Sequence, residues 1–387
     1  MYELILFSKE NFQGKHHHVF AEEVGQGDKN LGNTRNLGNA ISSVIIKAGY
    51  WEFHNTLDFN DSNRVELSPG MYNRIYDEKI KNNSISSVCL SRVEGKLDGL
   101  KEVIIFTKEN FQGAHHHIIR RSLNEGEYDL NLIKPVQMNN KTSSAIVVSG
   151  KWGFYKDMFY QGKEMDLDPG MYPGFKGIGM DNKVSSIKLI SMEDVRDLTD
   201  LMEVVLFKGK NCQQIHHHVY AQRFEQGNNR LGNTQGMDNA TSSLVVVRPS
   251  RWVFYEKPDY KGLRTKLEQG IYYNFNYIDI SDNALSSVKI VETKILINLM
   301  EDTRELKVYI ENLADGFTEV SIYLDEEEII HEDDLVKTNT KTYIYTANPE
   351  DVGTHEIKVE VHTGDGFIDV EHQSIEIAQI APIPPVT

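Results

Sequence analysis

The sequence of 387 residues contains only two cysteines, Cys89 and Cys212, and they lie far apart in the chain. So few cysteines predict no disulfide framework, which fits a reducing compartment and also a cysteine-poor secreted protein. No apolar run is long enough to span a bilayer, so no membrane span is expected. The first residues alternate like a strand and lack the basic region of a signal peptide. The compartment stays open between the cytoplasm and a spore or cell surface.

Sequence motifs of catalysis are absent as well. No Gly-rich phosphate loop follows a strand and opens a helix, and no Gly-x-Ser-x-Gly elbow occurs. Cys89 has no identifiable base beside it in the sequence. Carboxylates such as Asp166 and Asp168 flank a turn, where solvation explains them most simply. We therefore expect a protein that is not an enzyme.

The sequence also lacks an excess of basic residues. It has 41 Lys and Arg against 57 Asp and Glu, a net charge of −16. Residues 297–387 hold 21 acidic and 5 basic residues, which leaves equal numbers of both in residues 1–296. Nucleic-acid binders need a basic surface, and an acidic face is repelled by anionic lipids. Neither nucleic acid nor a lipid surface is an expected partner.

A repeat of about one hundred residues dominates what the sequence does contain, and this period is the size of a domain. The motif Glu-Asn-Phe-Gln-Gly at 10–14 recurs at 109–113, and a weaker copy stands at 210–214. Each copy precedes three consecutive histidines. The second half of each repeat opens with a tryptophan and later has a Pro-Gly or Gln-Gly turn before a tyrosine: Trp51 and Tyr72, Trp152 and Tyr172, Trp252 and Tyr272.

Short β-rich segments lie between the Gly, Asn and Asp residues of each repeat, as at 44–46, 145–148 and 244–247. Many short strands at regular spacing predict β-sandwiches, and two similar halves in each repeat predict paired four-strand Greek keys. No long helix is expected, although residues 193–198 could form a helical turn.

The repeat marks stop near residue 299, but alternating segments continue at 306–310, 319–324 and 356–361. This pattern predicts a small immunoglobulin-like β-sandwich, followed by a mobile Pro-rich tail at 381–385. The predicted domains are 1–93, 99–192, 201–293 and 299–387, and the fold class is all-β.

Five polar clusters have the complete pattern Asn/Asp, Asn/Asp, two variable residues, Ser, Ser, and they begin at Asn82, Asn139, Asp181, Asp238 and Asp282; a sixth begins at Gly38, with Gly in the first position. Calcium takes six to eight oxygen ligands, which Asn, Asp and Ser supply, whereas zinc would favour His or Cys. A capped turn would explain one such cluster. Six copies, paired 42 to 44 residues apart within three repeats, favour a binding site.

The clusters, the Phe-x-Gly loops, the Trp-led second halves and the Pro-Gly-x-Tyr turns together resemble the microbial βγ-crystallin family over residues 1–293. The resemblance implies that two Greek-key motifs form one sandwich, with two calcium ions at one end that both motifs share. It implies four kinds of ligand. They are the first-position side chains of Asn82, Asn139, Asp181, Asp238 and Asp282; the third-position carbonyls of Ala40, Ser84, Lys141, Lys183, Ala240 and Ala284; the fifth-position hydroxyls of Ser42, Ser86, Ser143, Ser185, Ser242 and Ser286; and the loop carbonyls of Ser8, Asn55, Thr107, Lys156, Lys208 and Glu256.

Departures from this pattern predict unequal sites. Gly38 supplies no side-chain oxygen, so one site of the first repeat should be weak or empty. Asn60-Asp61 replaces the aromatic-x-Gly ending in the same repeat, and Cys212 and Gln214 replace Phe and Gly in the third, which puts the Lys208 carbonyl in doubt. Because many ligands are neutral, we expect dissociation constants of about 10 µM to 1 mM.

The triple histidines lie on predicted strands, where the first and third side chains point to one side. A transition-metal or pH-responsive surface is one interpretation, and histidines of neighbouring subunits could meet there. The simpler interpretation is that duplication of the repeat copied a strand that packs well with histidines. Two imidazoles on one strand face are too few for a closed zinc site.

Two functions remain open from the sequence. The first is a calcium-stabilised structural or surface-coat protein that could self-assemble. The second is a calcium-dependent module that binds a carbohydrate or a cell surface, for which a secreted toxin is one setting.

Overall fold

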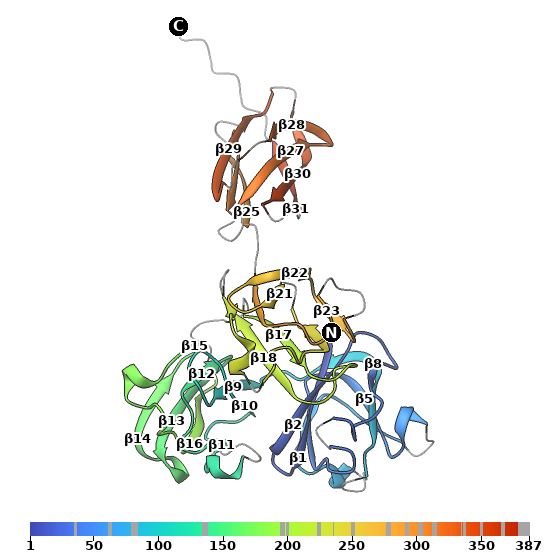
Figure 1. Ribbon diagram of the computed structural model, residues 1–387, viewed down its shortest axis with the longest axis vertical. Coiled ribbons are helices and arrows are strands. Elements are labelled where there is room, and N and C mark those ends of the chain that lie inside the picture. Colours follow the sequence, from blue (N-terminus) through green and yellow to red (C-terminus); the bar gives the residue numbers. More distant parts are fainter. Residues whose placement is uncertain are drawn as a thin grey trace. The chain divides into compact units, whose positions relative to one another are not determined.

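The computed structural model in Figure 1 is built almost entirely of antiparallel strands. It comprises two compact units, residues 1–290 and 291–387. Among the described residues there is no helix long and apolar enough to cross a membrane. The residues that the structure describes are 1–34, 37–60, 64–78, 84–133, 138–193, 198, 201–222, 226–234, 236–248, 252–275, 280–290, 294–300, 305–311, 316–333, 335, 338–348, 351–364 and 368–377.

The first repeat has two four-stranded sheets, ordered β2-β1-β4-β7 and β3-β8-β5-β6. Each half of the repeat therefore gives one strand to the sheet of the other half, as paired Greek keys require. The strands are β1 (Tyr2–Lys9), β2 (Gln13–Ala21), β3 (Gly27–Asp28), β4 (Ser43–Ile46), β5 (Ala48–His54), β6 (Val65–Leu67), β7 (Gly70–Tyr72) and β8 (Ser87–Lys96), with the 3₁₀ turns η1 (Leu57–Phe59) and η2 (Ile75–Glu78).

The second and third repeats have the same sheet orders. The second consists of β9 (Lys101–Phe106), β10 (His115–Arg120), β11 (Gly126–Glu127), η3 (Leu130–Leu132), β12 (Ser144–Val147), β13 (Lys151–Asp157), η4 (Met158–Tyr160), β14 (Gln161–Leu167), β15 (Gly170–Tyr172), η5 (Lys176–Ile178) and β16 (Ser186–Ser191). The third consists of β17 (Met202–Phe207), β18 (His216–Ala221), β19 (Gly227–Asn228), η6 (Leu231–Asn233), β20 (Ser243–Val246), β21 (Trp252–Lys257), β22 (Lys261–Leu267), β23 (Gly270–Tyr272) and β24 (Ser287–Ile290). The predicted all-β, paired Greek-key fold is confirmed.

The tryptophan that opens each second half lies at the centre of its own repeat. Trp51, Trp152 and Trp252 are fully buried, each in a separate hydrophobic core. The indole N–H groups of Trp51 and Trp152 donate to the carbonyls of Ala48 and Ser149, at 3.0 and 2.9 Å. Each ring therefore buries a large apolar area without leaving its polar atom unsatisfied.

Strand β1 is buried on both faces because its repeat packs against another repeat. Leu4 and Leu6 belong to the core of the first repeat, whereas Ile5 and Phe7 share a cluster with Ile119 of the second. This double burial explains why these strands have continuous apolar runs instead of a strict alternation.

The same contact recurs around a closed ring of three repeats. Tyr220 of the third repeat joins a cluster with Ile104 of the second, and Phe20 of the first joins one with Val205 of the third. The three repeats therefore surround a common centre, which Figure 1 shows between β2, β10 and β18.

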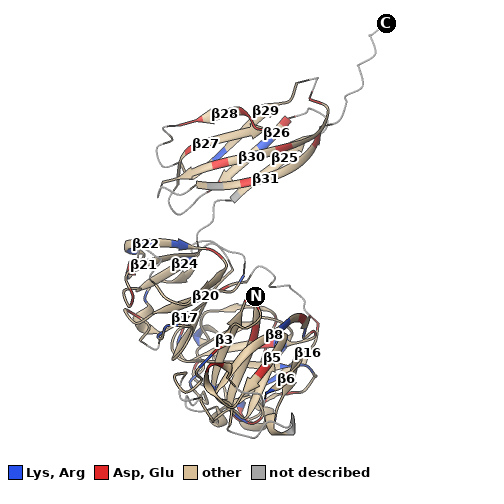
Figure 2. Cartoon of the chain, turned by 90° about the vertical axis from the view of Figure 1, so that its right-hand side faces the viewer, with Lys and Arg blue, Asp and Glu red and all other residues tan. Residues whose placement is uncertain are grey.

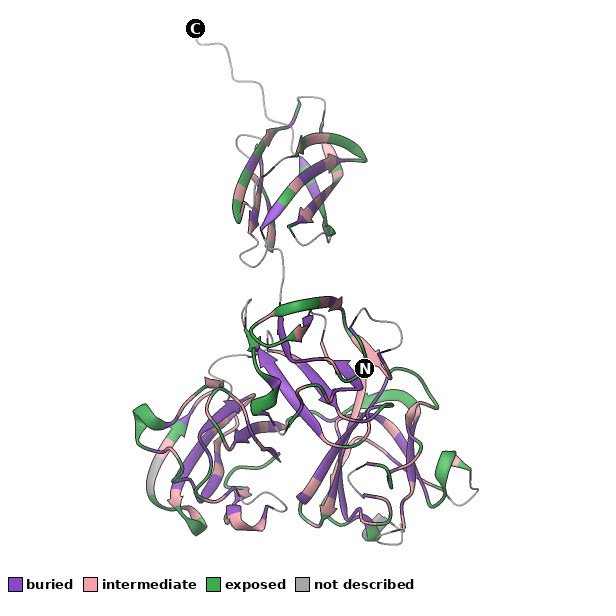
Figure 3. Cartoon of the chain, in the orientation of Figure 1, coloured by how far each residue is buried: buried purple, intermediate pink, exposed green. Residues whose placement is uncertain are grey.

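The nine histidines of these three strands lie at that centre. All nine are at most 5% exposed, and Figure 3 shows their strands as buried segments. The interpretation of these strands as an exposed histidine surface, which was the alternative to an inherited, well-packing strand, does not hold in this structure, and the histidines meet within one chain and not between subunits. The repeats of one molecule cover them.

The C-terminal unit has a three-stranded sheet, β25-β26-β29, and a four-stranded sheet, β28-β27-β30-β31, over one shared core. Strand β25 begins at Lys294, before the predicted domain start at residue 299, and pairs with β26. Figure 2 shows acidic residues along the strands of this unit. Its strands are β25 (Lys294–Met300), β26 (Glu305–Glu311), β27 (Phe317–Leu324), β28 (Glu327–Glu332), β29 (Thr340–Thr346), β30 (Gly353–Thr363) and β31 (Ile368–Ile377). The predicted turn at 193–198, except its two ends, and the tail at 381–385 lie outside the described residues.

Candidate metal centres

The second residue of each described cluster has a left-handed backbone conformation, which asparagine tolerates better than most residues. The φ angles lie between 48° and 62° for Asn39, Asn140, Asn182, Asn239 and Asn283. Their backbone N–H groups donate to the carbonyl of the fourth residue in the partner cluster, at 2.9–3.2 Å. The two clusters of each repeat are therefore hydrogen-bonded to each other, as their pairing in the sequence predicts.

Side chains also link the paired clusters. The fifth-position hydroxyl of one cluster donates to the second-position amide oxygen of the other, as from Ser143 to Asn182 and from Ser185 to Asn140, both at 3.3 Å. The same link joins Ser242 to Asn283 at 3.1 Å. It also joins Ser286 to Asn239 at 3.3 Å and Ser86 to Asn39 at 3.4 Å. Five fifth-position hydroxyls thus lie where two clusters meet.

The first-position side chains hold the clearest candidate ligand atoms. The Oδ1 atoms of Asn139, Asp181 and Asp238 are buried without a hydrogen-bond partner among the described residues. An unsatisfied buried carboxylate or amide oxygen is costly, so these atoms fit a cation. Asp282 is exposed and forms an ion pair with Lys210 at 3.7 Å. Asn82 lies outside the described residues.

Two predicted loop carbonyls lie beside the clusters of the first repeat. Ser86 Oγ donates to the Asn55 carbonyl at 2.9 Å, and Ser42 Oγ donates to the Ser8 carbonyl at 3.4 Å. The other predicted loop residues occupy the matching strand ends: Thr107 and Lys208 follow β9 and β17, and Lys156 and Glu256 lie near the ends of β13 and β21.

The third-position residues stand inside the cluster turns, namely Ala40, Ser84, Lys141, Lys183, Ala240 and Ala284. Ser84 Oγ also donates to Asn55 Oδ1 at 3.2 Å. The structure thus gathers the described members of the predicted set at one end of each repeat, and their ligation stays a prediction.

The sixth-position serine has a role that the sequence did not indicate. In all six copies its hydroxyl donates to a loop carbonyl at 2.5–2.7 Å and accepts a backbone N–H from the folded hairpin at 2.9–3.3 Å. Adjacent strand residues point to opposite faces, so one serine of the pair faces the cluster and the other fastens the hairpin. The invariant Ser-Ser doublet was the available signal.

The third repeat keeps its folded hairpin despite Cys212 and Gln214. Cys212 has a left-handed φ of 56°, and its N–H donates to Ser243 Oγ at 2.9 Å. Gln214 has a φ of 68°, and its Cγ would lie 2.8 Å from a Cβ placed on Gly209. Gly209 thus provides the space that the larger residue needs.

Gly38 is closely packed as well as lacking a ligand atom. A Cβ on Gly38 would lie 2.8 Å from both the backbone nitrogen and the Cα of Gly32. In the third repeat Asp238 occupies the position that matches Gly38, and its Cβ would lie 3.4 Å from a Cβ placed on Gly232. A side chain at position 38 therefore requires a shift of the Gly32 backbone. Asp61 lies outside the described residues.

Cys89 does have a potential base nearby, contrary to the sequence-based expectation. His54 on the neighbouring strand places Nε2 3.6 Å from Cys89 Sγ. Burial, reinforced by Glu52, nevertheless raises the pKa of the thiol to about 11. The thiol therefore stays protonated near neutral pH, unlike an activated nucleophile.

The family model Beta/Gamma crystallin matches residues 3–90, 102–190 and 204–291. Human beta-crystallin B2 is 27% identical over 174 residues, which cover 44% of this chain and 75% of that protein. An archaeal βγ-crystallin of known structure is 33% identical and covers 23% of this chain and 98% of its own, with a TM-score of 0.20. A transition-metal-ion-binding βγ-crystallin from Methanosaeta thermophila is 26% identical over 23% of this chain and 99% of its own, with a TM-score of 0.19.

Proposed function

This chain belongs to the βγ-crystallin family, and on that premise we propose that its three repeats are calcium-binding domains that calcium stabilises. The observation that carries the proposal is the set of buried, unpartnered first-position oxygens of Asn139, Asp181 and Asp238. Oxygen-only clusters favour calcium over zinc or copper, which prefer nitrogen and sulfur ligands.

The sites should differ among the repeats in charge and therefore in affinity. The third repeat has two first-position aspartates, the second has Asp181 and Asn139, and the first has Asn82 and Gly38. Calcium affinity rises with the number of charged ligands, so the third repeat should bind most tightly and the first most weakly. Ion pairing with Lys210 offsets part of this advantage at Asp282, because calcium must displace the ammonium.

The role that we infer for the calcium-loaded chain is structural. Binding to the folded state alone stabilises it by about 2.7 kcal/mol at a hundredfold the dissociation constant. Each ion would hold two hairpin loops together at one end of a sandwich. A surface or coat protein would benefit from such stabilisation, and self-association remains part of this proposal.

Calorimetric calcium titration tests the proposal, with melting curves recorded in calcium and in chelator. We expect binding heat and a higher melting temperature in calcium. Asp181→Ala should remove one of the tighter sites, whereas Asp98→Ala, an exposed carboxylate outside the clusters, should leave the titration unchanged. An absence of both heat and melting shift in the unaltered chain would refute calcium binding.

The second candidate function is calcium-dependent binding of a carbohydrate or a cell surface, and a different measurement distinguishes it from a structural role. A glycan array probed with and without calcium should give no calcium-dependent signal if the role is purely structural. A reproducible calcium-dependent signal would instead establish the binding module.

A further inference from the structure

Six of the nine central histidines form a closed polyhedron. They are the first and third histidines of β2, β10 and β18, named here the histidine cage: His16, His18, His115, His117, His216 and His218. Twelve pairs of their rings have centroids 4.5–5.5 Å apart. Each of the six rings has four such neighbours, so the twelve edges outline an irregular octahedron, and the three remaining pairs are its opposite corners.

The octahedron has two triangular faces that each take one histidine from every repeat. His16, His115 and His216 form the first triangle, with centroids 5.0–5.2 Å apart. The second triangle, of His18, His117 and His218, has centroids 4.5–4.7 Å apart. Each repeat therefore gives two imidazoles, and no repeat could form the cage alone.

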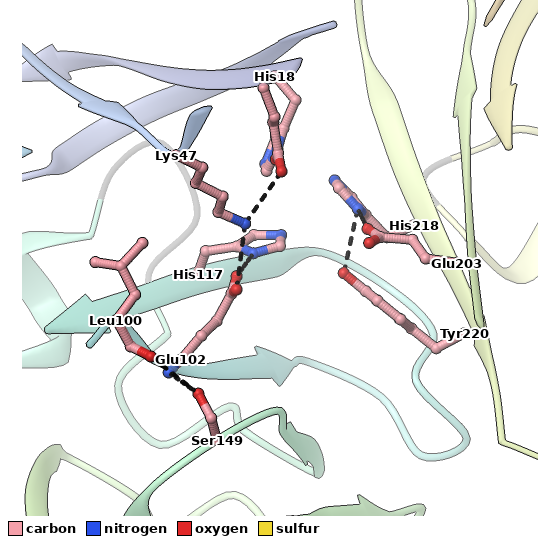
Figure 4. Close-up of polar contacts among 10 residues, drawn as sticks. His18, Lys47, Leu100, Glu102, His117, Ser149, Glu203, His218 and Tyr220 are labelled. Atoms are coloured by element: carbon pink, nitrogen blue, oxygen red, sulfur yellow. Dashed lines mark hydrogen bonds and ion pairs between the residues drawn. The ribbon is translucent and has the colours of Figure 1, made fainter. Parts of the chain in front are cut away.

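Carboxylates orient the second triangle from outside. The Nδ1 atoms of His18 and His117 lie 2.6 Å from Glu3 and Glu102, and His218 Nδ1 is hydrogen-bonded to Glu203. Figure 4 shows His117 beside Glu102 and His218 beside Glu203. A proton held on Nδ1 leaves Nε2 with a lone pair, which is the arrangement of metal-binding histidines and their supporting carboxylates.

Most Nε2 atoms of the cage lack a hydrogen-bond partner among the described residues. The Nε2 atoms of His18, His117, His216 and His218 are buried with no hydrogen-bond partner among the described residues. The Nε2 atoms of His16 and His115 lie 3.3 Å apart. Adjacent ligands of an octahedral ion with bonds of about 2.2 Å at right angles lie about 3.1 Å apart, so this separation suits a shared ion.

Charged side chains lie beside the second triangle. Glu3, Glu102 and Glu203 supply three negative charges, and Lys47 lies 3.3 Å from Glu3 and 3.2 Å from Glu102. In the second and third repeats, valines occupy the position of Lys47, namely Val148 and Val247. Lys47 and these two valines each donate the backbone N–H to the carbonyl of the glutamate in their own repeat, at 2.9–3.0 Å, which identifies the positions as equivalent. Lys47 therefore offsets part of the acidic charge beside the second triangle, and Lys96 and Arg248 also line the cavity that the three glutamates share.

We propose that the histidine cage binds one divalent first-row transition-metal ion in six-coordinate geometry, and that this ion fastens the three repeats together. Six imidazoles suit Fe²⁺, Co²⁺ or Ni²⁺ better than calcium, which takes oxygen, or structural zinc, which takes four ligands. Six protein ligands leave no position for a substrate, so the site is structural. It is independent of the oxygen-only clusters at the ends of the repeats.

The test uses the full chain, produced in minimal medium with added Co²⁺ and purified without a histidine tag. Metal analysis should find one Co²⁺ per chain, with the weak visible absorption of six-coordinate Co²⁺. Excess calcium should not displace it, and Asp181→Ala should retain it. A chain without bound Co²⁺, or with the intense absorption of four-coordinate Co²⁺, would overturn the proposal.

Two neighbouring histidines of β10 give matched variants. His115→Gln removes a cage ligand whose Nδ1 has no partner, and we expect affinity for Co²⁺ to fall by about tenfold or more. His116→Gln changes an equally buried histidine outside the cage and should retain one Co²⁺ per chain. If both folded variants retain Co²⁺ equally, or lose it equally, metal binding by the histidine cage is contradicted. If His115→Gln does not fold, the stoichiometry and absorption of the unaltered chain decide the question.

Discussion

The Lys47 ammonium of the first repeat lies 3.2 Å from the Glu102 carboxylate of the second repeat. Burial opposes the charge on Lys47, but Glu102 and Glu3 outweigh it and raise the pKa of the ammonium. Burial likewise opposes ionisation of Glu102, yet Lys47 and His117 lower the pKa of its carboxyl. Valines stand at the matching positions of the other repeats, so this one cation balances part of the acidic charge around the centre.

Replacing this cation should destabilise the junction between repeats. Lys47→Val introduces the residue that the other repeats carry and leaves two carboxylates without their ammonium partner. Breaking one side of a buried ion pair costs about 3 kcal/mol. Chemical denaturation should show this loss for Lys47→Val, and almost none for Lys9→Val at an exposed position of β1. Equal stabilities for both variants would contradict a structural role for the ion pair.

The two serines of one doublet should respond differently to removal. Ser144→Ala leaves the Phe111 N–H and the Lys108 carbonyl without the hydroxyl that now bonds both, at 3.1 and 2.6 Å. Unsatisfied groups of this kind cost about 1–3 kcal/mol, so the calcium-free protein should become less stable. Ser143→Ala should instead reduce the melting shift that calcium produces. Melting curves of both variants in calcium and in chelator distinguish the two roles, and a reversed pattern would contradict the assignment.

Restoring an aspartate at position 38 should have opposite effects with and without calcium. The added Cβ must displace the Gly32 backbone, so Gly38→Asp should lower the melting temperature in chelator. The new carboxylate adds a charged ligand, so calcium should raise the melting temperature by more than it does in the unaltered chain. Asp238→Gly makes the reverse change in the third repeat and should lose calcium. An unchanged titration in both variants would count against the ligand assignment.

Both thiols should be protected in the folded chain, with a defined pH dependence. Burial raises the pKa of Cys212 to about 12 and, with Glu52, that of Cys89 to about 11. Judged by thiolate fraction, alkylation by iodoacetamide at pH 9 should therefore be roughly 80-fold slower at Cys89, and slower still at Cys212, in the folded than in the urea-unfolded chain, whose thiols have pKa values of about 8.5. Raising the pH to 10 should accelerate the folded reaction about tenfold and the unfolded one less than twofold. Rapid alkylation at pH 9 without unfolding would show that burial does not protect the thiols.

Much of the fold was predictable because local patterns repeat three times. The strand at 43–46, the buried Trp51 and the turn before Tyr72 each recur in the other repeats, so local errors in one copy are corrected by the others. The doublet of serines was recognised as part of one binding pattern, but its second member proved to fasten a hairpin. A strand's two faces separate these roles, and a linear pattern does not show which face meets which loop.

The sequence by itself determined the all-β repeats, the paired polar clusters and the location of the acidic charge, because all three depend on residues close together along the chain. Only the tertiary structure showed that the histidines of the three repeats are buried together at one centre. His16, His115 and His216 are about one hundred residues apart in sequence, yet their rings lie 5.0–5.2 Å from one another. Packing of apolar outer faces, such as those of Ile5 and Phe7, closes the ring of repeats. Such contacts between domains have no local periodicity, so the sequence did not disclose them.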